Sequence, residues 1–138
     1  MQAGIEPYIR EEAREYWEAL SREELRIQRC IKCGEHVFYP REACPYDQGE
    51  LKYVRVSGRG KVLSFTVVHK DPNPVFAPYL PMVVAVIQLE EGPTMMSRVI
   101  NVEPDQVQFN QEVAVVFERI SEQRTLPFFQ PVDLRLNG

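Results

Sequence analysis

The sequence has no excess of basic residues and no long apolar run. Among its 138 residues, 16 Lys and Arg stand against 20 Asp and Glu, and the formal net charge is −4. Nucleic-acid binders usually carry a basic face because neutralising phosphates supplies much of their affinity, so this balance argues against that class. The longest apolar stretch, Met82–Ile87, is too short to cross a bilayer. Residues Met1–Glu24 hold no apolar run of signal-peptide length, so we expect a cytoplasmic location.

Motifs that would carry catalysis are also scarce. The two histidines, His36 and His69, do not combine with a nucleophile in a recognisable order. Ser64 and Ser97 lie inside strand-like patterns and lack an elbow motif. Gly58-Arg59-Gly60 is too short for a dinucleotide-binding or phosphate-binding loop. The residues alone therefore offer no recognisable catalytic group.

The sequence does contain enough aromatic surface for a folded core. Seven Phe, six Tyr and one Trp accompany an apolar content of 44%, which is typical of a folded globular protein. Apolar residues recur at helical spacing in Glu11–Leu20 and predict a short amphipathic helix. On that helix Trp17 either packs against the next module or contacts a partner.

Three cysteines lie within fifteen residues and indicate a metal site. Cys30 and Cys33 have the spacing of one zinc-ribbon knuckle, and Gly34 suits the positive φ that lets backbone N–H groups point at the thiolates. Cys44, followed by Pro45, fits the start of a second knuckle. A stretch this short and polar needs such a cross-link because it cannot hold a core of its own.

The fourth ligand is open. Asp47 stands where a fourth cysteine is expected, and a carboxylate oxygen is a legitimate zinc ligand, although closed structural sites favour sulfur and nitrogen. His36, three residues beyond Cys33, is the alternative protein ligand. Water at the fourth position, or a ribbon that has lost its metal, are the remaining interpretations.

Beyond Val54 the chain is rich in strand patterns. Runs of β-branched and aromatic residues are separated by Gly and Pro, as in a small closed barrel or sandwich. A further short strand, Leu25–Arg29, leads into the first knuckle, and Glu103–Asn110 is expected to be a short helical turn or a loop. The expected strands and extended segments are Val62–His69, Met82–Leu89, Met95–Val102, Val113–Phe117 and Thr125–Val132.

The loop Asp71–Pro81 contains four prolines with apolar residues between them. Prolines reduce the entropy that a loop loses on docking, and apolar residues on an ordered loop often mark a contact surface. The loop therefore either contacts a partner through Phe76 and Tyr79 or folds back so that these rings cap the barrel.

The order of these features resembles one family, first defined as a domain of unknown function, number thirty-five. Its members combine a rubredoxin-like zinc ribbon with an OB-fold barrel and are associated with acyl-CoA. The resemblance covers almost the whole chain, and the segments that carry it are Glu24–Cys30, Cys33-Gly34, Pro40-Arg41, Cys44-Pro45, Gly60–His69, Pro81–Ala85, Val113–Glu118 and Thr125–Phe129.

The resemblance implies a mainly β fold with three parts. An N-terminal helical segment occupies residues 1–24, the zinc ribbon residues 25–53, and a five-stranded OB-fold barrel with a C-terminal tail residues 54–138. Zinc would be structural and held by Cys30, Cys33, Cys44 and Asp47, with His36 as the alternative fourth ligand.

By the same resemblance, the chain is not an enzyme by itself. It is expected to be an accessory subunit that forms a hetero-oligomer with a thiolase or a thiolase-like aldolase, in steroid side-chain or other CoA-ester degradation. The coenzyme A thioester would be the substrate of the complex and not a cofactor of this chain. The residues expected to contact the partner or the acyl-CoA are Trp17, Phe76, Tyr79, Phe128 and Phe129.

Two other functions remain as alternatives. A single-stranded nucleic-acid-binding OB module would use stacking aromatics and basic groups, for which Tyr53, Phe65 and Arg59 are the candidates. Arg59 belongs to the local basic cluster Arg55, Arg59 and Lys61, which also fits a solvated strand face. A stand-alone metal-dependent enzyme is the weaker alternative.

Overall fold

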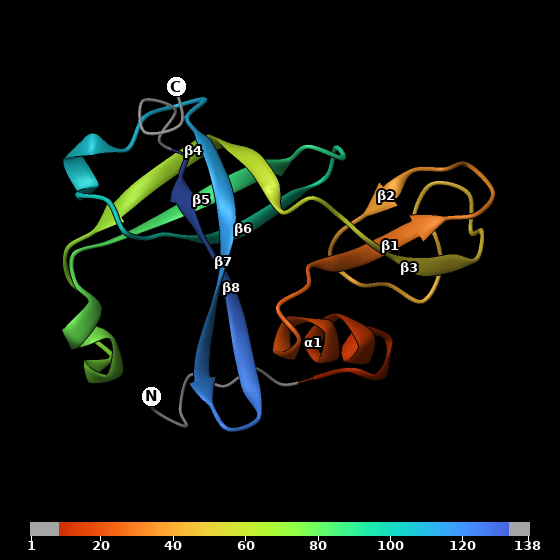
Figure 1. Ribbon diagram of the computed structural model, residues 1–138, viewed down its shortest axis with the longest axis horizontal. Helices are drawn as coiled ribbons and strands as arrows, with labels where there is room; N and C mark the ends of the chain where they lie inside the picture. Colours follow the sequence, from red (N-terminus) through yellow and green to blue (C-terminus); the bar gives the residue numbers. More distant parts are fainter. Residues whose placement is uncertain (1–8, 133–138) are drawn as a thin grey trace.

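The computed structural model describes residues 9–132, which form a helix, a small sheet and a barrel (Figure 1). The helix lies beneath the small sheet in this view, and the barrel lies beside both. The expected fold class is confirmed, because the described chain is mainly strand, with one N-terminal helix, a ribbon region and a closed five-stranded barrel.

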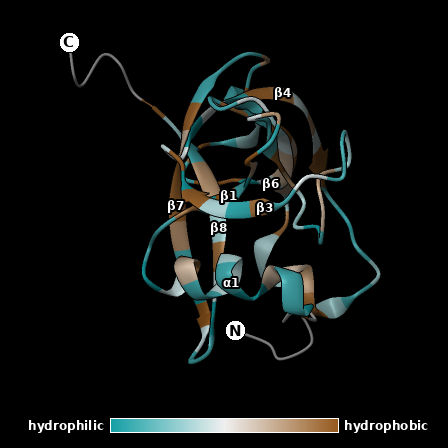
Figure 2. Ribbon diagram, turned by 90° about the vertical axis from the view of Figure 1, so that its right-hand side faces the viewer, coloured by the Kyte–Doolittle hydropathy of each residue, from teal (hydrophilic) through white to brown (hydrophobic). Residues whose placement is uncertain are grey.

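The helix α1 (Arg14–Ser21) follows a 3-10 turn, η2 (Glu11–Ala13), and the two cover the expected helical segment. Its inward face buries Tyr16, Ala19 and Leu20, and it packs against strands β1 and β8. Figure 2 shows this helix from the side of the small sheet, with apolar and polar residues alternating along it. Within residues 9–132, no helix is long and apolar enough to cross a membrane.

The small sheet consists of three antiparallel strands in the order β2-β1-β3. These are β1 (Arg26–Cys30), β2 (His36–Val37) and β3 (Leu51–Arg55). The central strand places Gln28 opposite both Val37 and Tyr53. Because β1 ends at Cys30, the sheet delivers the first cysteine directly to the start of the first tight turn.

The barrel closes in the order β4-β5-β6-β8-β7, and β7 returns to β4. Its only parallel pairing joins β6 and β8, as in an OB-fold. Two 3-10 turns, η3 (Pro74–Tyr79) and η4 (Pro104–Gln106), interrupt the loops, and η3 occupies most of the proline loop. The barrel strands are β4 (Arg59–Val68), β5 (Met82–Leu89), β6 (Thr94–Val99), β7 (Glu112–Ser121) and β8 (Arg124–Pro131).

The hairpin β7–β8 extends beyond the closed part of the barrel. Strand β8 pairs with β6 at a single position, Val99 with Phe129, whereas β7 and β8 stay paired as far as Ser121 and Arg124. The far half of the hairpin reaches past the barrel towards the level of α1 (Figure 1). Strands β6 and β8 therefore separate on the side that faces α1.

One apolar core joins the three parts. Side chains from the helix and the ribbon pack in the same cluster as side chains from the barrel, so the ribbon has no separate core. This follows from its small size, because a module of this length cannot bury enough apolar surface alone. The buried members of the cluster are Tyr16, Leu20, Leu25, Ile27, Val56, Val62, Val83, Ala85, Ile87, Leu89, Met95, Val99, Val107, Val113 and Phe129.

Adjacent phenylalanines on β8 should differ sharply in their effect on stability. Phe129 is 0% exposed in the core, so Phe129→Ala should lower the free energy of unfolding by about 3–5 kcal/mol. Phe128 is only partly buried, so Phe128→Ala should cost about 1 kcal/mol. Urea denaturation followed by the fluorescence of Trp17 measures both, and equal losses would contradict the placement of Phe129 in the core.

Candidate functional site

The three cysteines and Asp47 converge at the end of the small sheet. One ligand atom from each residue lies within 4.8 Å of those of the other three. The Sγ atoms of Cys33 and Cys44 are 3.8 Å apart, and Cys30 Sγ lies 3.4 Å from Asp47 Oδ1. The structure therefore brings together the four side chains that the ribbon pattern places in one site.

The spacing of these donors fits a tetrahedral zinc ion. With Zn–S bonds of about 2.3 Å, two sulfurs of a tetrahedral site lie about 3.8 Å apart, and a sulfur and an oxygen lie somewhat closer. The observed separations agree with both values, because the sulfurs of Cys33 and Cys44 are 3.8 Å apart and the sulfur of Cys30 lies 3.4 Å from the Asp47 oxygen. Three thiols and one carboxylate thus have the geometry and the chemistry to hold zinc.

Backbone groups of the two turns fix the donors. The N–H groups of Lys32 and Cys33 point at Cys30 Sγ, at 3.3 and 3.4 Å, and Gly34 has the expected positive φ of 80°. In the second turn, the N–H of Gly49 donates to Asp47 Oδ1 at 2.8 Å. Such amide dipoles stabilise negative charge at the donor atoms.

These hydrogen bonds favour the anionic forms that bind a metal. The backbone N–H of Cys33, followed by that of Lys32, lowers the pKa of Cys30. The backbone hydrogen bond from Gly49, followed by that from the Cys44 side chain, lowers the pKa of Asp47. For Cys33, a backbone hydrogen bond with Glu35 acts to lower the pKa, but desolvation and the neighbouring thiols and carboxylate outweigh it and raise the value to about 12. The crowding of acidic donors is thus itself an unfavourable feature that a cation would relieve.

His36 lies on β2, opposite Arg29 of β1. The group of converging donors in the described chain contains Asp47 and does not contain His36. The choice of Asp47 over His36 as the fourth ligand stays a prediction, and the converging geometry is the reason to prefer Asp47.

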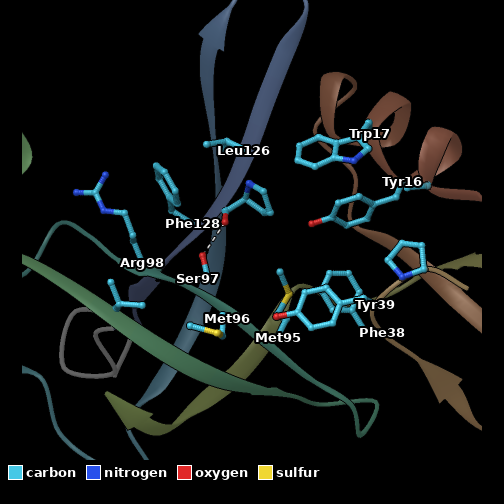
Figure 3. A pocket seen from close by; sticks show the side chains of 14 residues that line it. Tyr16, Trp17, Phe38, Tyr39, Met95, Met96, Ser97, Arg98, Leu126 and Phe128 are labelled. Carbon is cyan, nitrogen blue, oxygen red and sulfur yellow. Dashed lines mark hydrogen bonds between the residues drawn. The ribbon is translucent and has the colours of Figure 1, made fainter. Parts of the chain in front are cut away.

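A second site is an apolar pocket of about 440 Å³ between the three parts of the molecule (Figure 3). Helix α1 supplies one wall, the segment after β2 a second, and the barrel strands β5, β6 and β8 the rest. The hydroxyl groups of Tyr16 and Tyr39 point into it. Its lining residues are Ala13, Tyr16, Trp17, Phe38, Tyr39, Pro40, Val84, Met95, Met96, Ser97, Arg98, Leu126, Pro127 and Phe128.

The pocket exists because β6 and β8 separate beyond their single pairing. Across the gap, Ser97 Oγ donates a hydrogen bond of 2.7 Å to the carbonyl of Pro127. On the ribbon side, the amide of Gln28 accepts from the backbone N–H of Arg41 and donates to its carbonyl, both at 2.7 Å. These two contacts from buried or partly buried side chains hold the barrel wall and the ribbon wall in place.

The expected contact residues fall into different environments. Trp17 and Phe128 line the pocket. Trp17 also packs against the core, as its packing interpretation expects, and its contact with a partner stays a prediction. Phe76 and Tyr79 lie on η3 and are partly buried. Phe129, however, is 0% exposed and belongs to the barrel core. This corrects its inclusion among the contact residues, because alternation along β8 turns Phe128 outward and Phe129 inward.

Sequence reasoning missed Arg98. Its guanidinium carbon lies 5.3 Å from the ring centroid of Tyr79 and 5.0 Å from that of Phe128. Desolvation, the main cause, lowers its pKa, while Tyr79 and Glu118 act in the opposite direction. No local pattern marks Arg98, because its neighbours come from η3 and β8 and meet it only when the barrel closes.

The residues proposed for nucleic-acid stacking do not gather on one surface. The Tyr53 hydroxyl donates to the backbone carbonyl of Glu12 at 2.6 Å and so ties the ribbon to the helix. Phe65 packs against Phe109 on the barrel, with ring centroids 5.1 Å apart. Arg59 and Lys61 line a separate, polar pocket that also contains the carboxylates Glu90 and Glu112.

A small sheet that carries two facing thiol-bearing turns, packed on an OB-fold barrel, defines a protein of the zinc-ribbon and OB-fold class. Residues 17–54 match the family model described as "ChsH2, rubredoxin-like zinc ribbon domain". Residues 53–118 match the model described as "ChsH2, C-terminal OB-fold domain". The chain belongs to the DUF35 family, as its similarity to curated members and to a solved structure also shows.

Two relatives and one solved structure illustrate the similarity. A "DUF35 domain-containing scaffold protein" from Methanothermobacter thermautotrophicus is 33% identical over 101 residues, which cover 72% of this chain and 75% of that protein. A "Probable enoyl-CoA hydratase alpha subunit" from Thermomonospora curvata is 30% identical over 126 residues, 91% of this chain but only 39% of that protein. The structure of an "Ltp2-ChsH2(DUF35) aldolase" aligns with a TM-score of 0.83 at 30% identity, covering 91% of this chain and 98% of that chain.

Replacing Asp47 tests whether its carboxylate is the fourth ligand. We expect Asp47→Ala to lower the zinc affinity by at least about tenfold, because even second-shell changes have effects of that size. Asp47→Cys, which supplies a fourth thiolate, should bind zinc more tightly. The zinc-to-protein ratio and competition with a chromogenic chelator measure both variants.

His36→Ala is the matched control for this test. A wild-type affinity in Asp47→Ala together with a weakened His36→Ala would make His36 the fourth ligand. Wild-type affinity in both variants would leave water at the fourth position.

Gly49 should contribute to zinc affinity although it supplies no ligand. A Cβ at this position would lie 2.8 Å from Cys30 Sγ and 2.9 Å from Asp47 Oδ1. We therefore expect Gly49→Ala to displace both donors and to weaken zinc binding, whereas alanine at the neighbouring, exposed Glu50 should have no effect. The same chelator competition measures this, and unchanged affinity in Gly49→Ala would show that the turn adjusts around the added carbon.

Proposed function

We propose that this chain is a non-catalytic accessory subunit of a thiolase-superfamily enzyme, a thiolase or a retro-aldolase, that acts on an acyl-CoA. The degradation of steroid side chains or of other CoA esters is the chemistry we propose for the complex. The partner would supply the catalytic groups, and this chain would shape the substrate channel and stabilise the assembly.

The observation that carries the proposal is the similarity to the ChsH2(DUF35) chain. The solved structure bears the name "Ltp2-ChsH2(DUF35) aldolase", and this chain covers 98% of the matched chain. The name scaffold protein of the archaeal relative supports the same kind of role. The hydratase subunit name of the actinobacterial relative supports CoA-ester chemistry, although this chain spans only 39% of that protein.

The geometry of the chain supports a binding role. An apolar pocket bounded by a helix, a ribbon and a barrel offers a preformed concave surface, and such surfaces are the usual binding sites of proteins. Partly exposed aromatic rings at its edge, such as Tyr39 at 52%, would lose contact with water in a complex.

We further propose that zinc has a structural role. In this view, zinc held by Cys30, Cys33, Cys44 and Asp47 keeps the ribbon folded against the barrel. The CoA thioester would bind to the complex as its substrate. The division into residues 1–24, 25–53 and 54–138 and a cytoplasmic location are part of the same proposal.

Co-expression with the thiolase-like proteins of the same genome tests the proposal. We expect this chain to co-purify with one of them and to elute with it as a stable hetero-oligomer at micromolar concentration. The isolated chain should show no thiolase or aldolase activity on acyl-CoA, and the complex should show it.

Each protein run alone on the same column is the control. Separate elution of this chain from every thiolase-like protein of the genome would refute the proposal. Activity of the isolated, zinc-loaded chain would instead favour a stand-alone enzyme.

A further inference from the structure

Arg98 is a partly buried cation whose guanidinium lies over two aromatic rings. Tyr79 from η3 and Phe128 from β8 both lie within cation–π distance of its guanidinium. Side chains from η3 and β8 thus meet Arg98 of β6, and Arg98 is partly buried. A guanidinium held in this way loses little entropy when it forms further hydrogen bonds.

The charge of Arg98 is not neutralised within the described chain. The ion pairs of residues 9–132 involve Arg14 and Arg26 and not Arg98. Glu118 favours the charged form of Arg98 but lies beyond ion-pair distance. The Nε atom of Arg98 is buried and has no hydrogen-bond partner. Because Nε is shielded from solvent, an external carboxylate would reach the terminal Nη groups of the guanidinium, and a charge-assisted hydrogen bond there would be stabilising.

The apolar pocket adjoins this cation directly. Phe128 and Arg98 both line the pocket, and the guanidinium of Arg98 lies over the ring of Phe128. Figure 3 shows Phe128 between the guanidinium of Arg98 and the aromatic side chains of the helix. An apolar cavity and a single positive charge are therefore parts of one surface.

The composition of this surface fits a protein partner. Aromatic residues, Met and Arg are the residue types that protein interfaces concentrate at their centre, and Lys and Glu are the types that they exclude. The pocket is lined by Trp17, two tyrosines, two methionines and Arg98, with no Lys or acidic residue. Met96 at 58% exposure lies on the rim and is free to adapt to an inserted group.

We propose that the pocket and Arg98 together form the docking site of the partner enzyme. The partner would insert an aromatic or aliphatic side chain into the pocket and place an Asp or Glu carboxylate on Arg98. This inference rests on the proposed function and adds to it the surface used and the chemistry of the partner segment.

Substitutions on this surface test the inference with the full chain and the co-purifying thiolase-like protein. Arg98→Gln removes the charge, and Met96→Glu places a carboxylate at the rim of the pocket. Each should weaken binding by about tenfold to a hundredfold, the range typical of central interface residues. Arg98→Lys should restore part of the affinity, because it keeps the charge but not the planar fork. Biolayer interferometry at two salt concentrations measures these affinities.

Arg59→Gln is the matched control, because it removes one positive charge from the barrel at a pocket that shares no residue with this surface. Its affinity should equal that of the wild type. Circular dichroism and thermal unfolding of every variant show whether a loss of binding comes from loss of the fold. Because Met96 is exposed to solvent, a substitution there should disturb the fold least.

The outcomes separate the two proposals. Wild-type affinity in both folded variants, Arg98→Gln and Met96→Glu, would overturn the docking site while leaving the proposed function intact. Absence of binding by the wild-type chain would overturn both. Loss of self-association or of acyl-CoA binding in Met96→Glu, with partner binding unchanged, would assign the surface to a second copy or to a small apolar ligand and would also overturn it.

Discussion

The apolar core shared by the helix, the ribbon and the barrel is the constraint on which the rest of the structure depends. Tyr16 and Leu20 of α1 and Ile27 of β1 lie in the same cluster as Phe129 of β8. A ribbon of this size cannot fold on apolar burial alone, so its position is set by the barrel against which it packs. This packing also fixes the separation between α1 and the β7–β8 hairpin, and the pocket is the space that this separation leaves.

The thiol cluster constrains the opposite end of the ribbon. Two tight turns hold three thiols and one carboxylate close together, and their backbone N–H groups stabilise negative charge at Cys30 and Asp47. In their anionic forms, four such donors at this spacing would repel one another unless a cation lay between them. The segment Phe38–Pro40, which forms the ribbon wall of the pocket, is thus anchored by the core at one end of the ribbon and by the donor cluster at the other. The side chain of Gln28 also makes two hydrogen bonds to the backbone of Arg41, just after this segment.

The pocket and Arg98 explain how a chain with few reactive groups could serve a catalytic assembly. In the proposed docking site, aromatic walls and one pre-positioned cation would bind a partner at low entropic cost, because little of the surface would have to be ordered on association. The proposed role as an accessory subunit places the chemistry on the partner and the shape of the interface on this chain. The barrel strands that separate, β6 and β8, are in this view the feature that turns a closed OB-fold into a binding surface.

The sequence by itself determined the local features. The spacing of Cys30 and Cys33, the helical period around Tyr16 and Trp17, and the strand patterns of the barrel depend on near neighbours in the chain, and the structure contains the corresponding turn, helix and strands. Only the tertiary structure decided that Phe128 faces outward and Phe129 inward. The alternation of side chains along a strand requires that the two residues face opposite sides, but the register of β8 with β7 decides which of them faces the core. Arg98 and the pocket were likewise beyond the sequence, because their contacts join η3, β6, β8 and α1, and those elements meet only through barrel closure and the shared core.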